Sequence, residues 1–351
     1  MVGFNLLTIC LCLISAYASN INPDHSWVFA FIGVVFPLTL LANLAWIGFW
    51  LFAKPLFALG SVAAIVFTWG SVTQNIVFNS KQAEPNDSDL KIITYNIKNF
   101  DLYNWSKNHE SRDTMLAILK RADPDILCLQ EFYTEDYGVS QNIKLLKDAG
   151  WKYFHFEPTL RLRNRDNWGI AIFSRFPIIH HDAIKFDNSK FNLAIYADIE
   201  IDKKVLRVYN LHLQSIHFGR SDYEYFKEPE APSQRSLPSI MRIASKLRSA
   251  FKKRGHQADS VREVVDNNQV PTIICGDFND TPNSYVYKSL SEGMKDAFLE
   301  AGNGIGSTYT GPIPFVRTDY VLLNNDLEVR SQKVIKREIS DHFPVEVIFG
   351  F

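Results

Sequence analysis

The pattern of charged and apolar positions divides the chain near residue 80. Three runs before that point carry no charged residue: Val2–Ala18, Trp27–Ala53 and Pro55–Asn79. The second and third runs exceed the roughly 20 apolar residues that an α-helix needs to cross a bilayer. We therefore expect both to be membrane helices joined by a tight turn at Lys54 and Pro55. Residues 1–80 are predicted to form a membrane anchor of two or three transmembrane helices.

The first run is shorter, and two interpretations stay open. Val2–Ala18 is either a further span or a signal segment, since it ends in Ala16-Tyr17-Ala18, which resembles a cleavage site for signal peptidase. Lys54 is the only lysine or arginine in the loops between the runs. The positive-inside rule therefore places that turn in the cytoplasm. An integral membrane protein with an extracytoplasmic C-terminal part is expected.

A short polar segment at residues 81–89 reads as a linker, and a different pattern begins at Leu90. Short runs rich in β-branched residues alternate there with amphipathic stretches. The predicted strands are Leu90–Tyr95, Ile126–Gln130, Gly169–Ser174, Leu193–Ile201, Val205–Leu211, Pro271–Cys275, Asp319–Leu323 and Val345–Phe349. The predicted helices are Ser111–Arg121, Gln141–Ala149, Ser236–Lys253, Ala258–Val265 and Ser284–Leu290. This order predicts an α+β domain at residues 90–351, with mixed sheets covered by helices.

Polar residues stand where several of these predicted strands end. They are Asn96 after LKIITY, Gln130 and Glu131 after DILCL, His212 in NLHL, Asp277 and Asn279 in GDFN, Asp319 in RTDY, and Asp341 and His342 in SDHF. Any one of them alone would be an ordinary turn or surface residue. Together, carboxylates, amides and imidazoles at sheet edges suit a hard cation and phosphate chemistry.

The segment Gly276-Asp277-Phe278-Asn279 follows a buried strand, with glycine at the point where the strand turns. If Phe278 packs inward, Asp277 and Asn279 face the same way, because side chains alternate along extended backbone. Asp341-His342 repeats a carboxylate beside an imidazole, which suits acid-base work.

The ordered motifs TYNI, LQEF, GIAIFSRFPI, NLHL, GDFN, RTDY and SDHFP resemble the endonuclease/exonuclease/phosphatase superfamily. The resemblance covers residues 90–351. It implies a four-layer α/β/β/α sandwich with two mixed sheets. It also implies a hydrolase that uses a divalent metal, Mg²⁺ with Mn²⁺ as a possible substitute, to cleave phosphoester bonds by in-line attack of water. Thr318 in RTDY stands where the family usually has an aliphatic residue.

The resemblance also implies roles for individual residues. Glu131 would be the principal metal ligand, Asn96 would complete or orient the ligand set, and Asp341 would be a possible second ligand. Asp277 would orient and deprotonate the attacking water, and Asn279 would hold either a phosphate oxygen or that water. His342 would contact the scissile phosphate with Asp319 as its partner, and His212 would stabilise the transition state.

Two basic features are weaker signals. Arg163 and Arg165 lie in a predicted loop and either grip a further phosphate of the substrate or simply face water. Arg235 to Arg262 contains eight lysines and arginines and one aspartate, which predicts an amphipathic helix with a basic face. That face can lie against anionic lipid, although an ordinary solvated helix is the favoured interpretation.

Charge leaves the substrate open. Lys and Arg number 37 and Asp and Glu 38, so the chain lacks the basic excess of a duplex-binding nuclease. Nor do basic and aromatic residues interleave as in a single-strand binder. A phospholipid headgroup, a small phosphodiester and nucleic acid all remain possible substrates. A catalytically idle, membrane-tethered binding module is the alternative from another functional class.

Overall fold

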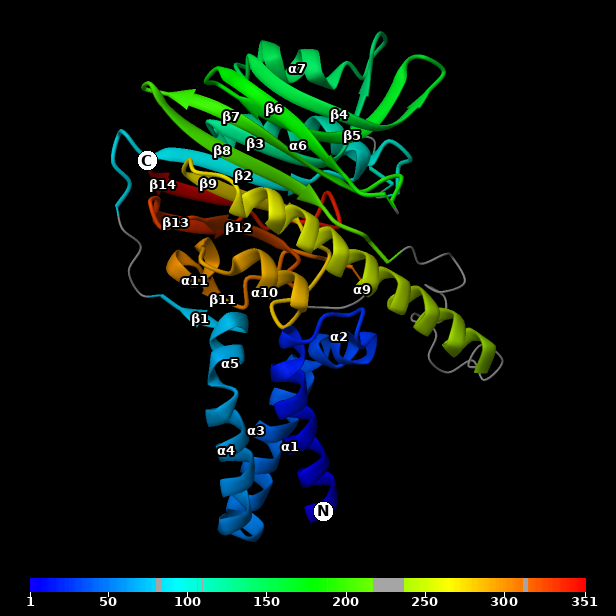
Figure 1. Cartoon of the computed structure of the whole chain (residues 1–351), viewed down its shortest axis with the longest axis vertical. Helices are drawn as coiled ribbons and strands as arrows, with labels where there is room; N and C mark the ends of the chain where they lie inside the picture. Colours follow the sequence, from blue (N-terminus) through cyan, green and yellow to red (C-terminus); the bar gives the residue numbers. More distant parts are fainter. Residues whose placement is uncertain (80–83, 106, 109, 188, 217–236, 312–314) are drawn as a thin grey trace. The chain divides into compact units, whose positions relative to one another are not determined.

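The computed structural model describes residues 1–79, 84–105, 107–108, 110–187, 189–216, 237–311 and 315–351. These residues form two compact units. The first contains residues 1–76, 214–259 and 280–289, and the second contains residues 77–213, 260–279 and 290–351. Figure 1 labels the helices and strands of both.

The first unit contains the apolar N-terminal helices. They are α1 (Val2–Tyr17), α2 (Trp27–Val34), α3 (Phe36–Ala53), α4 (Ala58–Phe67) and α5 (Trp69–Asn75). Two helical segments are long and apolar enough to cross a membrane, Val2–Asn20 and Phe36–Ala53, among the residues described. Pro55–Phe67 and Trp69–Asn75 would make a third span if they count as one, but the two segments are bent by 66° relative to each other.

Two of the sequence predictions for this region were wrong. The run Trp27–Ala53 is not one helix, because α2 ends at Val34 and α3 begins at Phe36. Pro37 lies at the start of α3 and cannot continue a preceding helix, since its ring lacks the N–H donor and collides with the previous turn. The run Pro55–Asn79 is likewise interrupted between α4 and α5 and ends in β1 (Val77–Phe78).

Buried polar groups link the apolar helices. Asn5 of α1 donates to Ser61 Oγ of α4 at 2.7 Å and accepts from the Trp50 indole of α3 at 2.8 Å. Ser15 and Thr39 hydroxyls lie 3.3 Å apart between α1 and α3. Because these polar groups hydrogen-bond to one another inside the bundle, they fix the relative positions of the helices, which apolar contacts alone specify less well.

The same unit holds most of α9 (Leu237–Asp266). The sequence predicted two helices here, but the structure has one continuous helix through Gly255. Tertiary contacts override the weak helix propensity of glycine. Arg254 Nε donates to Asp280 at 2.9 Å in a buried ion pair, and Lys252 Nζ lies 3.4 Å from Asp24. The predicted basic helix begins at Arg235, which lies outside the described residues.

The second unit is built on two six-stranded mixed sheets. One has the order β13-β14-β2-β3-β5-β4 and the other β10-β12-β9-β8-β7-β6. The bounds in the first sheet are β2 (Leu90–Asn96), β3 (Ile126–Glu135), β4 (Tyr153–Leu162), β5 (Asp166–Ser174), β13 (Glu328–Val334) and β14 (Val345–Gly350). Those in the second are β6 (Ile178–Lys185), β7 (Leu193–Ile201), β8 (Lys204–His212), β9 (Thr272–Asp277), β10 (Lys295–Asp296) and β12 (Asp319–Leu323). The predicted α+β class with two mixed sheets is confirmed.

The two sheets share one pairing scheme. Each has a parallel pair near its centre, β2 with β3 and β8 with β9, flanked by antiparallel neighbours. The remaining pair is β1 with β11 (Asn303–Gly304). Four strands of the two sheets were not predicted from the sequence, β4, β6, β10 and β13, and all four lie at sheet edges. The side chains of β4 and β6 are largely exposed, so these strands lack the apolar alternation that marks a half-buried strand.

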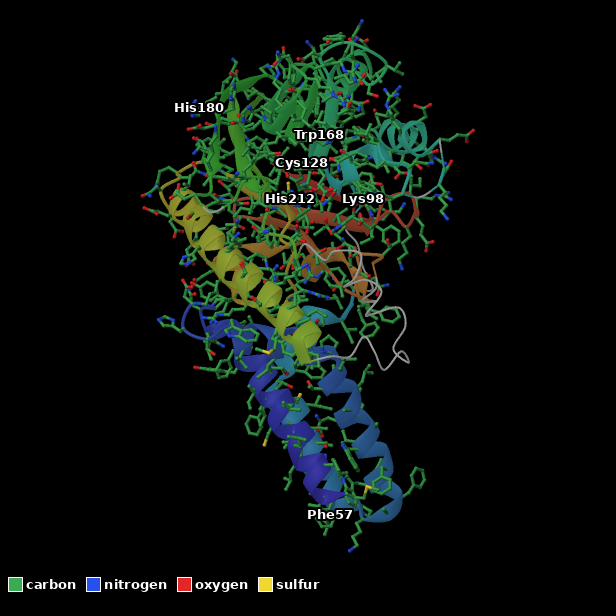
Figure 2. The ribbon with its side chains drawn as sticks, turned by 90° about the vertical axis from the view of Figure 1, so that its right-hand side faces the viewer. Phe57, Lys98, Cys128, Trp168, His180 and His212 are labelled. Atoms are coloured by element: carbon green, nitrogen blue, oxygen red, sulfur yellow. The ribbon has the colours of Figure 1, made fainter. Side chains whose placement is uncertain are left out.

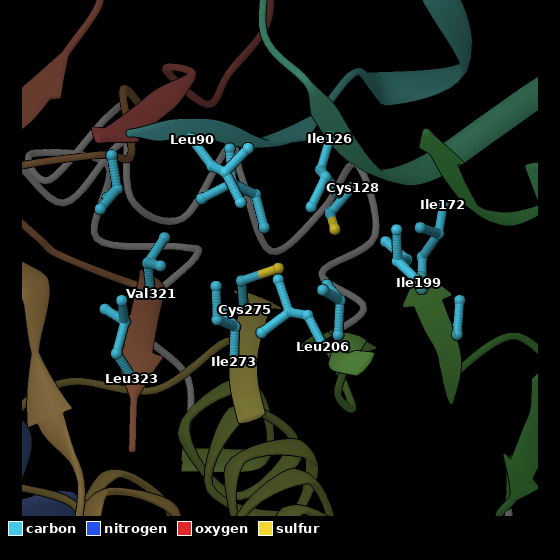
Figure 3. Packing of buried hydrophobic residues seen from close by; sticks show 14 of the residues in the cluster. Leu90, Ile126, Cys128, Ile172, Ile199, Leu206, Ile273, Cys275, Val321 and Leu323 are labelled. Carbon is cyan, nitrogen blue, oxygen red and sulfur yellow. The ribbon is translucent and has the colours of Figure 1, made fainter. Parts of the chain in front are cut away.

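The main core lies between the inner faces of the two sheets. Alternate residues of β2, β3 and β5 meet those of β7, β8, β9 and β12, and Cys128 and Cys275 come from opposite sheets (Figure 3). A second cluster covers the outer face of the first sheet, where α6 (Ser111–Ala122) and α7 (Asn142–Asp148) pack on β2, β3 and β5. On the second sheet, α11 (Ala297–Ala301) packs against β12.

Candidate active site

Strand register brings the polar residues together. In the parallel pairs, Asn96 lies beside Gln130 and His212 lies beside Asp277. Asp319, the first residue of β12, is opposite Asp277 in the antiparallel pair β12–β9. The carboxyl ends of β2, β3, β8 and β9 therefore supply most of one site, as the order of motifs predicted. Figure 2 labels His212 at the end of β8 and Lys98, which follows β2.

Glu131 is turned into this site by a bulge in β3. The register between β3 and β5 shifts between Leu129 and Phe132, and Glu131 has a φ of 47°. A bulge re-aims one side chain out of the regular alternation, and a non-glycine residue with positive φ is held there by its surroundings. The neighbouring Gln130 is buried and donates to Asn210 of β8 at 2.6 Å, which ties the two sheets together behind Glu131.

The GDFN segment has the geometry that its pattern predicted. Phe278 is fully buried and stacks on Tyr320 at a centroid distance of 4.8 Å. Asn279, with a φ of 54°, donates its backbone N–H to Asp277 Oδ1 at 2.8 Å and its side chain to Oδ2 at 3.1 Å. Asp277 is thus held by two donors from the same turn.

One amide bridges two carboxylates of the site. Asn96 Nδ2 lies 3.3 Å from Glu131 Oε1 and 3.1 Å from Asp277 Oδ2. Its Oδ1 accepts from the Lys98 backbone N–H at 3.1 Å. His212 Nε2 approaches the same two oxygens, at 3.7 Å from Glu131 and 4.0 Å from Asp277. In this arrangement the Asn96 side-chain nitrogen orients the two carboxylates. Its oxygen faces the Lys98 backbone N–H and is not directed at a cation between the carboxylates.

His342 completes the site from the loop before β14. Its Nδ1 lies 2.9 Å from Asp319 Oδ2, and its Nε2 lies 3.6 Å from Asp277 Oδ2. Burial by itself would lower the pKa of His342, but the attraction of Asp319 and Asp277 outweighs it and raises the pKa to about 10. The imidazole is therefore a buried cation at neutral pH, and Thr318 Oγ1 also donates to Asp319 Oδ2 at 3.0 Å.

The surroundings of two carboxyl groups in the site raise their pKa values. Desolvation raises the pKa of Asp277 to about 6, with nearby Asp319 adding to the rise and His342 opposing it. Desolvation also raises the pKa of Glu131, and Asp341 adds to this effect. Both groups thus gain from any cation that binds between them.

A family model described as the endonuclease/exonuclease/phosphatase family matches residues 93–342. The chain belongs to this family. Membership supports a hydrolase that acts on phosphoester bonds. A second family model, described as a domain of unknown function, matches residues 1–75.

Similar proteins agree with this assignment. Protein angel of Drosophila melanogaster is 24% identical over 274 residues, which cover 69% of this chain and 70% of that protein. The CCR4-NOT transcription complex subunit 6-like-B of Xenopus laevis is 25% identical over 231 residues, 54% of this chain, and the match spans 39% of that protein. The human nocturnin catalytic domain with bound sulfate anion shares the fold, with a TM-score of 0.54, 20% identity, and coverage of 76% of this chain and 96% of nocturnin.

The family is generally metal-dependent, and the donor set here fits a divalent cation. Glu131 offers a half-buried carboxylate and Asp277 a buried one, and carboxylate oxygens are ligands that Mg²⁺ and Mn²⁺ prefer. Asp277, Asp319 and His342 also place one ligand atom each within 4.8 Å of one another. Within this group, Nδ1 of His342 already lies 2.9 Å from Asp319 Oδ2, so the Asp319 carboxylate orients the imidazole.

Asp341 and Arg165 have partners within the protein. Asp341 Oδ2 lies 2.8 Å from Lys98 Nζ at the rim of the site. Arg165 lies 3.1 Å from Asp166 and 3.5 Å from Glu135, so its charge is already matched. Arg163, with a φ of 54°, is exposed in the loop between β4 and β5. A substrate-binding role for the two arginines stays a prediction.

Sequence reasoning missed several residues that support the site. Asn210 receives the hydrogen bond from Gln130 and donates to the Ala171 carbonyl at 2.8 Å, and Ser340 Oγ donates to the Asn96 carbonyl at 2.9 Å. Asn210 and Ser340 stand inside the motifs NLHL and SDHF, so their position was available. Lys98 had no comparable signal, because its role depends on contact with a residue far along the chain.

Proposed function

We propose that this chain is a divalent-metal-dependent phosphoesterase that hydrolyses a phosphodiester or phosphomonoester by in-line attack of water. The observation that carries the proposal is the bridge from Asn96 to Glu131 and Asp277, 3.3 and 3.1 Å long, beside the Asp319–His342 pair. It combines oxygen donors for a cation with a positively charged group for the phosphate.

The metal would be held by Glu131, whose carboxylate Asn96 orients, with Asp341 as a further ligand if Lys98 releases it. Mg²⁺ is the proposed cofactor and Mn²⁺ a substitute, because carboxylate oxygens suit both. When bound, such a cation neutralises negative charge on the phosphate and favours attack by water.

The protein groups divide the remaining work. Asp277 is poised to orient water and accept its proton, because a base with a pKa of about 6 exists in its charged form at neutral pH. Asn279 fixes the direction of that carboxylate. The His342 imidazolium contacts the scissile phosphate, with Asp319 setting its orientation, and His212 supports the transition state from the side of Glu131.

We also propose that residues 1–80 anchor this enzyme in a membrane, that residues 81–89 link anchor and catalytic domain, and that the domain at 90–351 lies outside the cytoplasm. The two apolar helices long enough to span a bilayer support the anchor. Reporter fusions at Lys54 and Phe351 should report opposite sides of the membrane. Reporters on the same side would refute the topology.

The activity is tested with the full-length protein in detergent, because residues 214–259 pack in one unit with the N-terminal helices. A panel of DNA, RNA, sphingomyelin, phosphoinositides and a chromogenic phosphodiester is incubated with Mg²⁺. Hydrolysis of at least one substrate is expected, and EDTA and His342→Ala should each abolish it. No turnover of any substrate would favour an idle binding module, and turnover indifferent to both treatments would equally overturn the proposed metal-dependent mechanism.

A further inference from the structure

A short segment after Asn96 is held in an unusual backbone conformation at the edge of the site. Lys98, Asn99, Phe100 and Asp101 have consecutive positive φ values of 45°, 55°, 55° and 55°. Non-glycine residues adopt the left-handed region at a cost, so a run of them persists only where the surroundings enforce it. Phe100 supplies one anchor, since it is buried and packs edge-on against Phe132 at 5.6 Å.

The residues that follow present aromatic rings to solvent. Tyr103 and Trp105 are 57% and 50% exposed, and their ring centroids lie 4.9 Å apart. Two large rings that keep half of their surface open form an apolar patch on the rim, where burial against a partner would be favourable. The core does not use them.

Lys98 connects these rings to the catalytic residues. Its Nζ lies 5.2 Å from the Trp105 ring centroid and 2.8 Å from Asp341 Oδ2. Asp341 is the residue before His342, and the charge of Lys98 is also close enough to lower the pKa of Glu131 in part. The aromatic pair is thus separated from the phosphate-binding groups by one cationic side chain.

We propose that Lys98, Tyr103 and Trp105 form a base-stacking subsite that selects single-stranded nucleic acid. The inference rests on the proposed phosphoesterase function and names its substrate class. Tyr103 and Trp105 stack the base of the nucleotide that flanks the scissile phosphate, and Lys98 exchanges its ion pair with Asp341 for a phosphate oxygen of the same strand. Stacking on aromatic rings beside a basic group is a general way to bind single strands.

The charge of Lys98 distinguishes this substrate from a choline lipid. Aromatic rings also bind quaternary ammonium groups through cation–π attraction. Here an ammonium already lies over Trp105, so a second cation at the same ring would meet repulsion. A neutral base next to an anionic phosphate meets no such penalty, which favours nucleic acid.

Basic and aromatic residues do not interleave along the chain as a whole, but the structure brings one lysine and two aromatic residues together here. Lys98, Tyr103 and Trp105 lie within eight residues of one another in the sequence. Their spacing fits neither a strand nor a helix. The left-handed turn at Lys98 to Asp101 reverses the chain and brings the lysine over the tryptophan.

The test compares two single-stranded DNA substrates of equal length with full-length protein in detergent. One is an oligothymidylate, and in the other alternate residues carry tetrahydrofuran in place of the base. The wild type should show a kcat/KM about 5- to 100-fold higher for the oligothymidylate, the range expected when one base stacks. Trp105→Ala should remove most of this preference through KM, while Trp105→Phe should keep most of it.

A matched control uses an exposed aromatic residue in the sheet that contains β3 and Glu131. Tyr153 is 40% exposed and begins β4, where it pairs with Ser174, which in turn pairs with Ile126 at the start of β3. That end lies roughly 17 Å along β3 from Glu131, at about 3.3 Å per residue. Tyr153→Ala should leave the preference unchanged.

The outcomes separate the subsite from the catalytic function. Turnover with equal kcat/KM for both substrates, or an equal loss on both in Trp105→Ala, overturns the subsite and leaves the phosphoesterase intact. If no substrate turns over, anisotropy of the two labelled strands in EDTA decides: a base preference that needs Trp105 supports the subsite, and its absence overturns it. If Trp105→Ala loses hydrolysis of sphingomyelin in mixed micelles but cleaves oligothymidylate as the wild type does, the base-stacking subsite is overturned in favour of lipid contact.

Discussion

The Nδ1 atom of His342 lies 2.9 Å from Oδ2 of Asp319, and both side chains are buried. The two residues come from a loop and from the first position of β12, so the pair exists only in the folded chain. It fixes the orientation of the imidazole and favours its charged form next to Asp277. This is the arrangement on which the proposed chemistry depends most directly.

Asp319→Asn should lower kcat by about 10²- to 10⁴-fold, the range typical when an imidazole loses its orienting carboxylate or its acid-base role. The side chain keeps its size, but His342 loses a buried ionic partner, so the melting temperature should fall as well. Steady-state kinetics and calorimetry on the same preparation measure both. Asp326→Asn, in the exposed turn after β12, is the control. An unchanged kcat in Asp319→Asn would remove Asp319 from the proposed site.

Glu131→Gln should weaken binding of Mn²⁺ by at least about 100-fold, because it removes the proposed principal ligand, a carboxylate held by the Asn96 amide. Electron paramagnetic resonance of free Mn²⁺ measures binding without reference to activity. Glu328→Gln, whose carboxylate is 66% exposed in β13, should bind Mn²⁺ as the wild type does. Equal affinity in Glu131→Gln and wild type would place the cation elsewhere.

His155 should make stability depend on pH. Burial lowers its pKa to about 4, and His181, whose ring stacks on it at 4.2 Å, adds to the effect, whereas Glu157 and Asp182 oppose it. The unfolded chain binds this proton near pH 6.5 and the folded chain only near 4, so stability falls as the pH drops through that window.

His155→Phe should therefore flatten part of this dependence. The fall in melting temperature between pH 7 and pH 5 should shrink by about 2–4 °C relative to wild type. His180→Phe, an exposed histidine of β6, should leave the fall unchanged. Parallel curves for wild type and His155→Phe would show that the buried imidazole does not titrate as inferred.

Gly276→Ala should destabilise the second unit by about 3 kcal/mol or more and remove activity. Gly276 has a φ of 133°, and an added Cβ would lie 2.1 Å from the Leu211 carbonyl oxygen. Strands β8 and β9 would have to separate just before Asp277. Gly150→Ala is the control, because Gly150 has a φ of 117° but no heavy atom within 4 Å. It should cost about 1 kcal/mol through backbone strain alone. Equal losses in thermal unfolding would mean that the strain, and not the close approach, governs Gly276.

The sequence determined the chemistry of the site and most elements that carry it. Apolar runs ending in Asn96, Asp277 and His212 predicted strands whose ends meet, because each strand with one buried face leaves a local apolar signature. Edge strands such as β4 and β6 leave none, and so they were missed. Membrane-length apolar runs were equally visible, although the break before α3 shows that composition does not report the helix boundary at Pro37.

Only the tertiary structure decided which of these groups touch. Asn96 reaches Asp277 across 181 positions of sequence, and that contact depends on how two sheets pack and on the bulge that turns Glu131. Lys98 gained its place between Trp105 and Asp341 in the same way. Residue type and local pattern are properties of a few neighbouring positions, whereas distances between strand ends arise from long-range pairing. The kind of bond that is broken was therefore readable early, and the surface that selects its substrate was not.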